Sequence, residues 1–107
     1  MKVAAVVSDL MLFSRIESAA RVVGAELTRV DAPTDLPADA DLVLVDWSDR
    51  QADWTDALRA QPGRVIVFGP HTDLDAHTAA RNAGLGPMWA RSRLLGELPS
   101  LLDAPGT

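Results

Sequence analysis

Polar and apolar positions follow one another along the chain in blocks that predict strands and helices in turn. Residues 3–7, 25–30, 42–45 and 65–68 have the length and β-branched content of strands. Between them, apolar side chains recur at helical spacing after residue 9, and shorter amphipathic helices are predicted at residues 53–61 and from residue 72 onward. This alternation indicates an α/β fold with a parallel sheet, helices on both faces and right-handed crossovers.

Individual residues predict where the helices begin and end. Gly24 stands where a left-handed cap would end the first helix. Thr72 and Asp75 resemble a capping box ahead of a helix that runs to Gly84. Ser92 is expected to cap a last helix after a short fifth strand at residues 88–90. Within that helix, Pro99 is expected to cause a kink or a restart.

One crossover departs from this pattern. Residues 31–41 contain Pro33 and Pro37, which lack the backbone N–H that a helix interior needs. We therefore expect at most a single helical turn between the second and third strands.

Polar side chains stand where the predicted strands end. Asp46 closes the apolar run at residues 42–45, and Ser8 and Asp9 follow the first strand. His71 comes soon after the fourth strand, and Arg91 follows the fifth. Because ligands of open α/β sheets bind at the carboxyl ends of the strands, we expect Asp9, Asp46, His71 and Arg91 to share that edge.

Composition narrows the classes of function. The 107 residues are expected to form one domain, residues 1–107. Ten Lys and Arg against fifteen Asp and Glu give a formal net charge of −5, which argues against general nucleic-acid binding. No cysteine is present, so disulfides and thiolate metal sites are excluded. Polar residues interrupt the N-terminal apolar stretch, so neither a signal peptide nor a membrane span is predicted, and the cytoplasm is the expected location.

Motifs of independent catalysis are missing from the sequence. The glycines form no Gly-x-Gly-x-x-Gly motif after the first strand, and no serine has a Gly-x-Ser-x-Gly context. His71 and His77 are six residues apart, which does not suit a helical metal motif. We therefore expect a protein that is not an enzyme.

The order of these segments resembles the receiver domains of bacterial two-component response regulators. The similarity spans most of the chain and rests on Val6-Val7-Ser8-Asp9 and on residues 41–46, 65–69, 83–84 and 88–92. The resemblance implies a flavodoxin-like, five-stranded parallel sheet in the order 2-1-3-4-5. It also places Asp46 at the phosphoacceptor position. If Mg²⁺ is bound, the resemblance implies that Asp9, Asp46 and the main-chain carbonyl of Ser48 hold it.

Four positions depart from the receiver pattern. Ser8 replaces the first acid of an acidic pair, and Gly69 stands where receivers carry Ser or Thr. Arg91 replaces a lysine, and Ser92 replaces the proline after it. A planar guanidinium cannot fill the socket of a compact ammonium group. These departures favour a stand-alone pseudo-receiver that acts by protein–protein interaction without phosphorylation, and no cofactor is expected.

Two other functions remain open. The chain could be a competent receiver, phosphorylated on Asp46 with Mg²⁺. Alternatively, His71, Arg91 and Ser92 could form a small-anion or nucleotide sensor, because Arg91 stands at the start of the last helix. Each residue also has a structural interpretation: Asp9 as a helix cap, Asp46 as a turn residue, and His71 and Arg91 as solvated side chains.

The partner is expected to be another protein or a second copy of the chain, since the sequence closes at residues 103–107 after the last helix. The proposed interface contains Trp89, Arg91 and Arg93, although core packing is slightly favoured for Trp89. Trp47 and Trp54 also suggest surface contacts. Replacing Arg91 or Arg93 with Ala is expected to weaken association without lowering the melting temperature appreciably.

Overall fold

Strands and helices alternate through the part of the chain that the structure describes, residues 1–103 of a computed structural model. The strands are β1 (Lys2–Val6), β2 (Glu26–Val30), β3 (Leu42–Asp46), β4 (Arg64–Gly69) and β5 (Trp89–Ala90). The helices are α1 (Leu10–Val23), α2 (Trp54–Arg59), α3 (Leu74–Asn82) and α4 (Arg91–Leu102). The C-terminal end, on which the stand-alone prediction rests, lies outside the described residues from 104 onward. No helix in residues 1–103 combines the length and apolar character needed to span a membrane.

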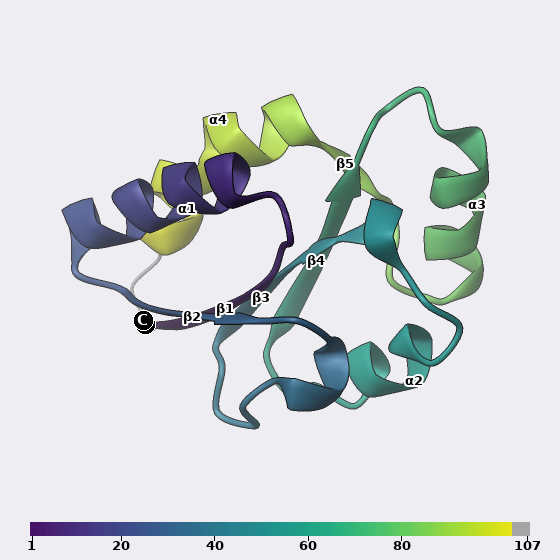
Figure 1. Ribbon diagram of the computed structural model, residues 1–107, viewed down its shortest axis with the longest axis horizontal. Coiled ribbons are helices and arrows are strands. Elements are labelled where there is room, and N and C mark those ends of the chain that lie inside the picture. Colours follow the sequence, from purple (N-terminus) through teal and green to yellow (C-terminus); the bar gives the residue numbers. More distant parts are fainter. Residues whose placement is uncertain (104–107) are drawn as a thin grey trace.

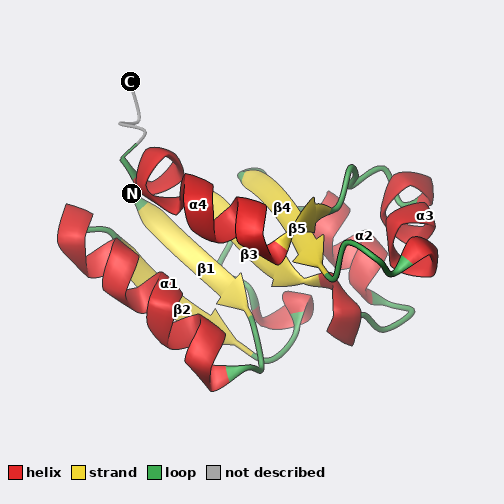
Figure 2. Cartoon of the chain, turned by 90° about the horizontal axis from the view of Figure 1, so that it is seen from above, coloured by secondary structure: helices red, strands yellow, loops and turns green. Residues whose placement is uncertain are grey.

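The sheet has five parallel strands in the order β2-β1-β3-β4-β5, which confirms the flavodoxin-like fold. All its arrows run the same way in Figure 2. Residue Val6 pairs with Val30 of β2 and Val45 of β3, so these three strands end at nearly the same level. That common level brings the residues that follow each strand to one edge.

The helices form one layer on each face of the sheet. Helices α1 and α4 lie together on one face, and α2 and α3 lie on the other (Figure 1). Every residue of β3 is buried, because this central strand is covered on both faces. On the α1 and α4 side, Ile16 and Leu94 are 0% exposed within the larger apolar cluster.

The crossover from β2 to β3 contains a short 3₁₀ turn, Pro33–Asp35, as its prolines predict. Pro33 is buried. Ala40 belongs to the apolar cluster on the α2 and α3 side, and Leu36 packs against this cluster. A loop therefore covers the part of the sheet that a crossover helix would otherwise cover.

The structure confirms some predicted helix ends and corrects others. Gly24 ends α1 with a φ of 71°, in the left-handed region. Asp73 caps α3 by accepting from the Ala76 N–H at 3.0 Å, so the prediction that placed Thr72 at the cap is wrong by one residue. Ser92 does not cap α4, because the helix already begins at Arg91 and Ser92 lies within its first turn.

Pro99 lies inside α4, and the helix continues to Leu102 without a restart.

The three tryptophans are buried: Trp47 is 2% exposed, Trp54 5% and Trp89 7%. The expected surface contacts of Trp47 and Trp54 are therefore wrong. Trp47 instead donates its indole N–H to the carbonyl of Ala76 at 3.1 Å, which satisfies its polar group inside the core.

Candidate functional site

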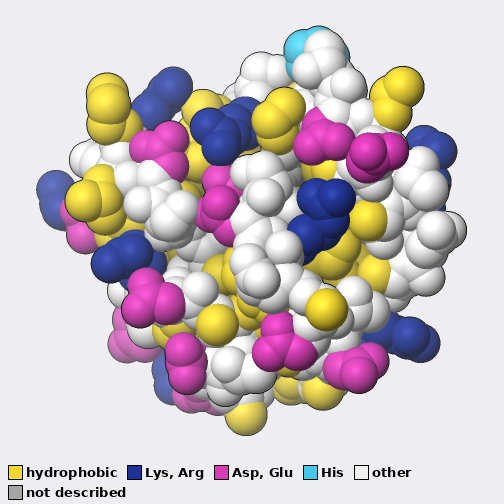
Figure 3. Space-filling model, turned by 45° about the vertical axis from the view of Figure 1, so that its right-hand side comes forward, with side chains coloured by type: hydrophobic (Ala, Val, Ile, Leu, Met, Phe, Trp, Pro, Cys, Tyr) yellow, Lys and Arg dark blue, Asp and Glu magenta, His cyan; other side chains and the backbone are white. Residues whose placement is uncertain are grey.

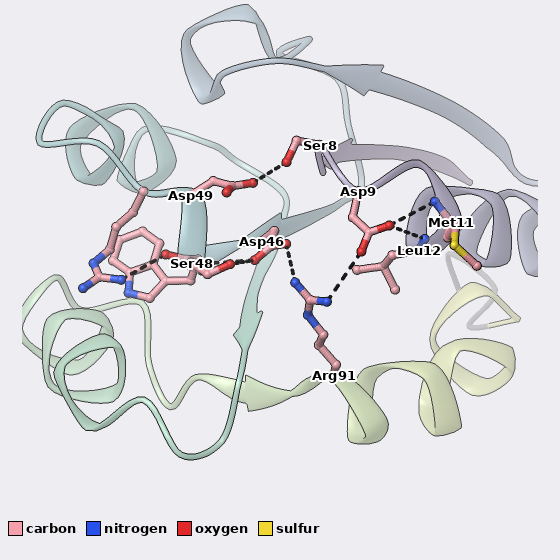
Figure 4. Close-up of polar contacts among 10 residues, drawn as sticks. Ser8, Asp9, Met11, Leu12, Asp46, Ser48, Asp49 and Arg91 are labelled. Atoms are coloured by element: carbon pink, nitrogen blue, oxygen red, sulfur yellow. Dashed lines mark hydrogen bonds and ion pairs between the residues drawn. The ribbon is translucent and has the colours of Figure 1, made fainter.

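Three charged side chains meet at the carboxyl edge of the sheet. Asp46 is the last residue of β3, Asp9 follows β1, and Arg91 is the first residue of α4 after β5. Figure 4 shows the Arg91 guanidinium pointing between the two carboxylates. This convergence agrees with the placement that the strand ends predict.

Asp46 is a buried carboxylate whose two oxygens both have partners. Its side chain is 2% exposed, and its Oδ2 accepts from Arg91 Nη2 at 3.0 Å. Its Oδ1 accepts from the backbone N–H of Ser48 at 3.2 Å and from the Ser48 hydroxyl. The backbone bond begins a 3₁₀ turn, Trp47–Asp49, so Asp46 is also a turn residue. The guanidinium supplies the opposite charge that a buried carboxylate requires.

Asp9 combines helix capping with an ion pair. Its Oδ1 accepts from the backbone N–H groups of Met11 and Leu12 at 3.0 and 3.1 Å, which makes it the N-cap of α1. Its Oδ2 lies 3.7 Å from Arg91 Nη1. Arg91 therefore connects the start of α1, the end of β3 and the start of α4.

Two more of the four departures from the receiver pattern, Ser8 and Gly69, are also built into local contacts. The Ser8 hydroxyl donates to Asp49 Oδ2 at 2.7 Å. Gly69 is buried, and a Cβ at this position would lie 3.2 Å from the Met88 sulfur. A Ser or Thr at Gly69 would thus require Met88 to move.

The donor set does not fit the magnesium site that the fold family implies. Ser8 contributes no carboxylate, and the oxygens of Asp9 and Asp46 are engaged by backbone N–H groups, a hydroxyl and a guanidinium. A hard dication requires several free oxygen ligands. In residues 1–103, no three or more His, Asp or Glu side chains are grouped so that they could hold a metal ion.

The remaining predicted residues lie around this cluster without joining it. His71 is exposed after β4, and its backbone carbonyl lies 2.9 Å from His77 Nε2. Ser92 is exposed on the first turn of α4. Arg93 lies over the ring of Trp89, with its Cζ 3.8 Å from the ring centroid, and donates from Nε to Glu97 at 2.7 Å.

This geometry corrects one expectation about Arg91. Because Arg91 neutralises a buried carboxylate, its replacement by Ala is expected to lower stability, contrary to the expectation of an unchanged melting temperature. The buried Arg91 Nε has no hydrogen-bond partner among the described residues. The charge of Arg91 nevertheless has a structural role, because it neutralises the Asp46 carboxylate.

Sequence reasoning assigned no role to Asp49 and Arg50 in the loop after Asp46. In this loop Asp49 accepts from Ser8, and Arg50 donates to the Trp47 carbonyl at 3.2 Å while lying 5.8 Å from the Trp47 ring centroid. The available signal was the run of polar residues at positions 48–51, directly after a strand end.

No protein-family model and no curated protein sequence matches the chain. Several solved receiver domains share its fold. A CheY-like response regulator receiver domain protein from Methanospirillum hungatei matches with a TM-score of 0.66 at 16% identity, covering 95% of this chain and 93% of the other. A receiver domain from Clostridium thermocellum gives a TM-score of 0.63 at 17% identity over 95% and 94% of the two chains. The receiver domain of a Francisella response regulator gives 0.63 at 15% identity over 95% and 96%.

Proposed function

We propose that this chain is a receiver-like signalling module that acts through protein–protein contacts and does not depend on phosphorylation of Asp46. The receiver fold supports the signalling role. The proposal that function does not depend on phosphorylation rests on a single observation, the ion pair between Arg91 and Asp46.

Phosphorylation of Asp46 would require one of its oxygens to be free for attack. One oxygen accepts from Ser48 and the other from Arg91. If Arg91 withdrew, the Asp46 carboxylate, which is 2% exposed, would lose its positively charged partner. A buried charge without a partner lowers the stability of the fold. A lysine would carry a compact charge on a flexible stem, whereas the guanidinium holds a planar fork against both acids.

The same contacts weigh against an anion sensor at Arg91. An anion approaching this guanidinium would also approach the carboxylates of Asp9 and Asp46, which already pair with it. Ser92 does not cap α4, so it does not help to build such a site. The proposal includes no cofactor and no catalytic step.

The proposed contact surface is the exposed part of α4 beside β5. Arg93 is half exposed, stacks on Trp89 and pairs with Glu97 one turn later. This pairing holds the guanidinium in one place, which lowers the entropy that a partner contact would cost. On the face shown in Figure 3, acidic and basic side chains are interspersed, which suits protein contacts better than nucleic-acid binding.

Capture experiments with immobilised protein from lysate of the native cell, together with sedimentation velocity, test this function. Wild type and Asp46→Asn are expected to recover the same partners or the same oligomer, because Asn still accepts hydrogen bonds but cannot take phosphate. Arg93→Ala is expected to lose them, with Arg59→Ala on α2 as the control for removal of an exposed arginine. Loss of association in Asp46→Asn, or its strengthening by acetyl phosphate, would contradict the proposal.

A further inference from the structure

A crevice of about 540 Å³ opens at the carboxyl ends of β1, β2 and β3. Its lining includes Ser8 after β1, Asp31 after β2, and Ser48 and Asp49 after β3. Asp9, Asp46 and Arg91 are not among its lining residues. The crevice therefore adjoins the charged cluster through Ser48, which donates to Asp46, but does not include its three charged residues.

The crevice follows from the missing crossover helix. The turn at Pro33–Asp35 replaces a helix between β2 and β3, and Ala32 in this connection forms part of the crevice wall. Val6, Val30 and Trp54 add apolar surface to the wall. The volume lies in the range of small-molecule sites, and the lining is about half polar, with six polar or charged residues among eleven.

Its place in the sheet also points to a ligand. The chain runs from β1 to β2 on one side and crosses to β3 on the other, so the strand order reverses between β1 and β3. In open α/β sheets, ligands bind in the crevice at this reversal, outside the carboxyl ends of the strands. In dinucleotide-binding sheets, which carry a Gly-rich turn that this sequence lacks, an acid about 20 residues after that turn hydrogen-bonds a ribose hydroxyl. Asp31 directly follows β2 and lines the crevice.

The charges favour a neutral ligand over a phosphorylated one. The lining carries the carboxylates of Asp31 and Asp49 and the guanidinium of Arg50, which is already engaged with the Trp47 carbonyl and ring. Asp31 Oδ1 lies 3.7 Å from Arg29 Nη1, and Asp49 Oδ2 accepts from the Ser8 hydroxyl. The helix N-terminus that would attract a phosphate is also occupied, because Asp9 accepts from the first N–H groups of α1. A phosphate here would meet two carboxylates, while the guanidinium groups of Arg29 and Arg50 already have partners.

From these observations we infer that the crevice binds a neutral, nucleoside-sized molecule. Its hydroxyl groups would donate to the carboxylates of Asp31 and Asp49, and its ring would pack on the half-buried side chains of Val30 and Ala32. Ser8 and Gln51 line the same crevice, and the Ser8 hydroxyl, which donates to Asp49, can still accept a hydrogen bond from a ligand. This inference goes beyond the proposed function and does not depend on it.

Titration of ¹⁵N-labelled full chain with adenosine tests the inference, with AMP and 2′-deoxyadenosine as matched probes. Adenosine is expected to shift the backbone amides of Ser8, Asp31, Ala32 and Asp49. AMP is expected to bind about tenfold more weakly because its charge faces the two carboxylates. Asp31→Asn is expected to weaken adenosine more than 2′-deoxyadenosine, since only adenosine has the 2′-hydroxyl.

Two variants in the connection between β2 and β3 show whether the amide shifts require an open crevice or are lost after any large substitution in this loop. Ala32→Trp places a large ring at the crevice wall and is expected to abolish the adenosine shifts. Ala38→Trp changes an exposed position of the same loop that does not line the crevice and is expected to leave them intact. The inference is overturned if adenosine shifts no crevice amide up to its solubility limit. Binding of AMP as tight as that of adenosine, or shifts confined to residues around Arg91, would also overturn it.

Discussion

Arg91 Nη2 and Asp46 Oδ2 lie 3.0 Å apart, although 45 residues separate the two in the chain. The pair connects the first residue of α4 to the last residue of β3, and Asp9 approaches the same guanidinium from the start of α1. A protein cation thus faces the two acids that would hold a dication in a conventional receiver. This arrangement makes Arg91 both a structural residue and the reason for expecting no phosphate on Asp46.

Arg91→Ala is expected to lower the free energy of unfolding by about 2–3 kcal/mol, because it leaves the buried Asp46 carboxylate without its charged partner. The value is below that of a fully buried pair, since the Arg91 side chain is 39% exposed. Urea unfolding measures the loss. Adding Asp46→Asn to Arg91→Ala removes the unpaired charge and is expected to restore part of it. A loss no larger than that of Arg59→Ala would show that the pair contributes little.

Substitutions of Trp89 and Arg93 are expected to lower stability by different amounts, because Trp89 packs in the core and Arg93 lies at the surface. Trp89→Ala removes a buried ring and should cost about 3–5 kcal/mol of stability. Arg93→Ala removes an exposed ion pair and a cation–π contact, so its cost should be about 1 kcal/mol or less. Thermal or urea unfolding compares the two. If Arg93→Ala destabilises as much as Trp89→Ala, its effect on association cannot be assigned to a lost partner contact.

Gly63 is expected to be required for the close approach of two loops. A Cβ at Gly63 would overlap the backbone carbonyl of Ala40 and lie 2.9 Å from that of Asp41. Gly63→Ala should therefore cost about 1–3 kcal/mol, as overpacking does elsewhere. Gly96→Ala is the matched control: nothing lies within 4 Å of its added Cβ in α4, and it should stabilise by about 0.5–1 kcal/mol. Equal stability of both variants would disprove this explanation.

Restoring two receiver residues is expected to restore metal binding. In Ser8→Asp combined with Arg91→Lys, the edge gains a carboxylate and loses the guanidinium fork that faces both acids. Affinity for Mg²⁺ should then rise by about tenfold or more, since affinity of such sites follows the number of charged oxygen ligands. Calorimetric titration measures the affinity, with wild type and Ser8→Asp alone for comparison. A double variant that binds Mg²⁺ no better than wild type would show that Arg91 does not block the site.

Much of this architecture could be predicted because the strands are short apolar runs that end in polar residues. Asp46 is an example: the buried run before it placed the carboxylate at the sheet edge. The crossover without a long helix followed from Pro33 and Pro37. Local capping was less predictable, because Thr72 and Asp73 are both good caps and only the path of the chain selects Asp73.

The contacts of the site could not be read from the sequence. The strand ends placed Arg91 at the same edge as Asp46, but the ion pair between the two side chains, 45 positions apart, depends on how the folded chain orients them. The same holds for Trp47, whose indole finds the Ala76 carbonyl inside the core. Both depend on the packing of distant segments, whereas hydrophobic periodicity reports only on the local chain.

Phosphorylation by a small donor tests the central claim most directly. Wild type is incubated with Mg²⁺ and acetyl phosphate, and intact mass spectrometry measures the phosphorylated fraction, with Asp46→Asn as the control. We predict little or no phosphate on wild type, because Arg91 and Ser48 engage both oxygens of Asp46. Stoichiometric phosphorylation of wild type that disappears in Asp46→Asn would contradict the account and identify the chain as a competent receiver.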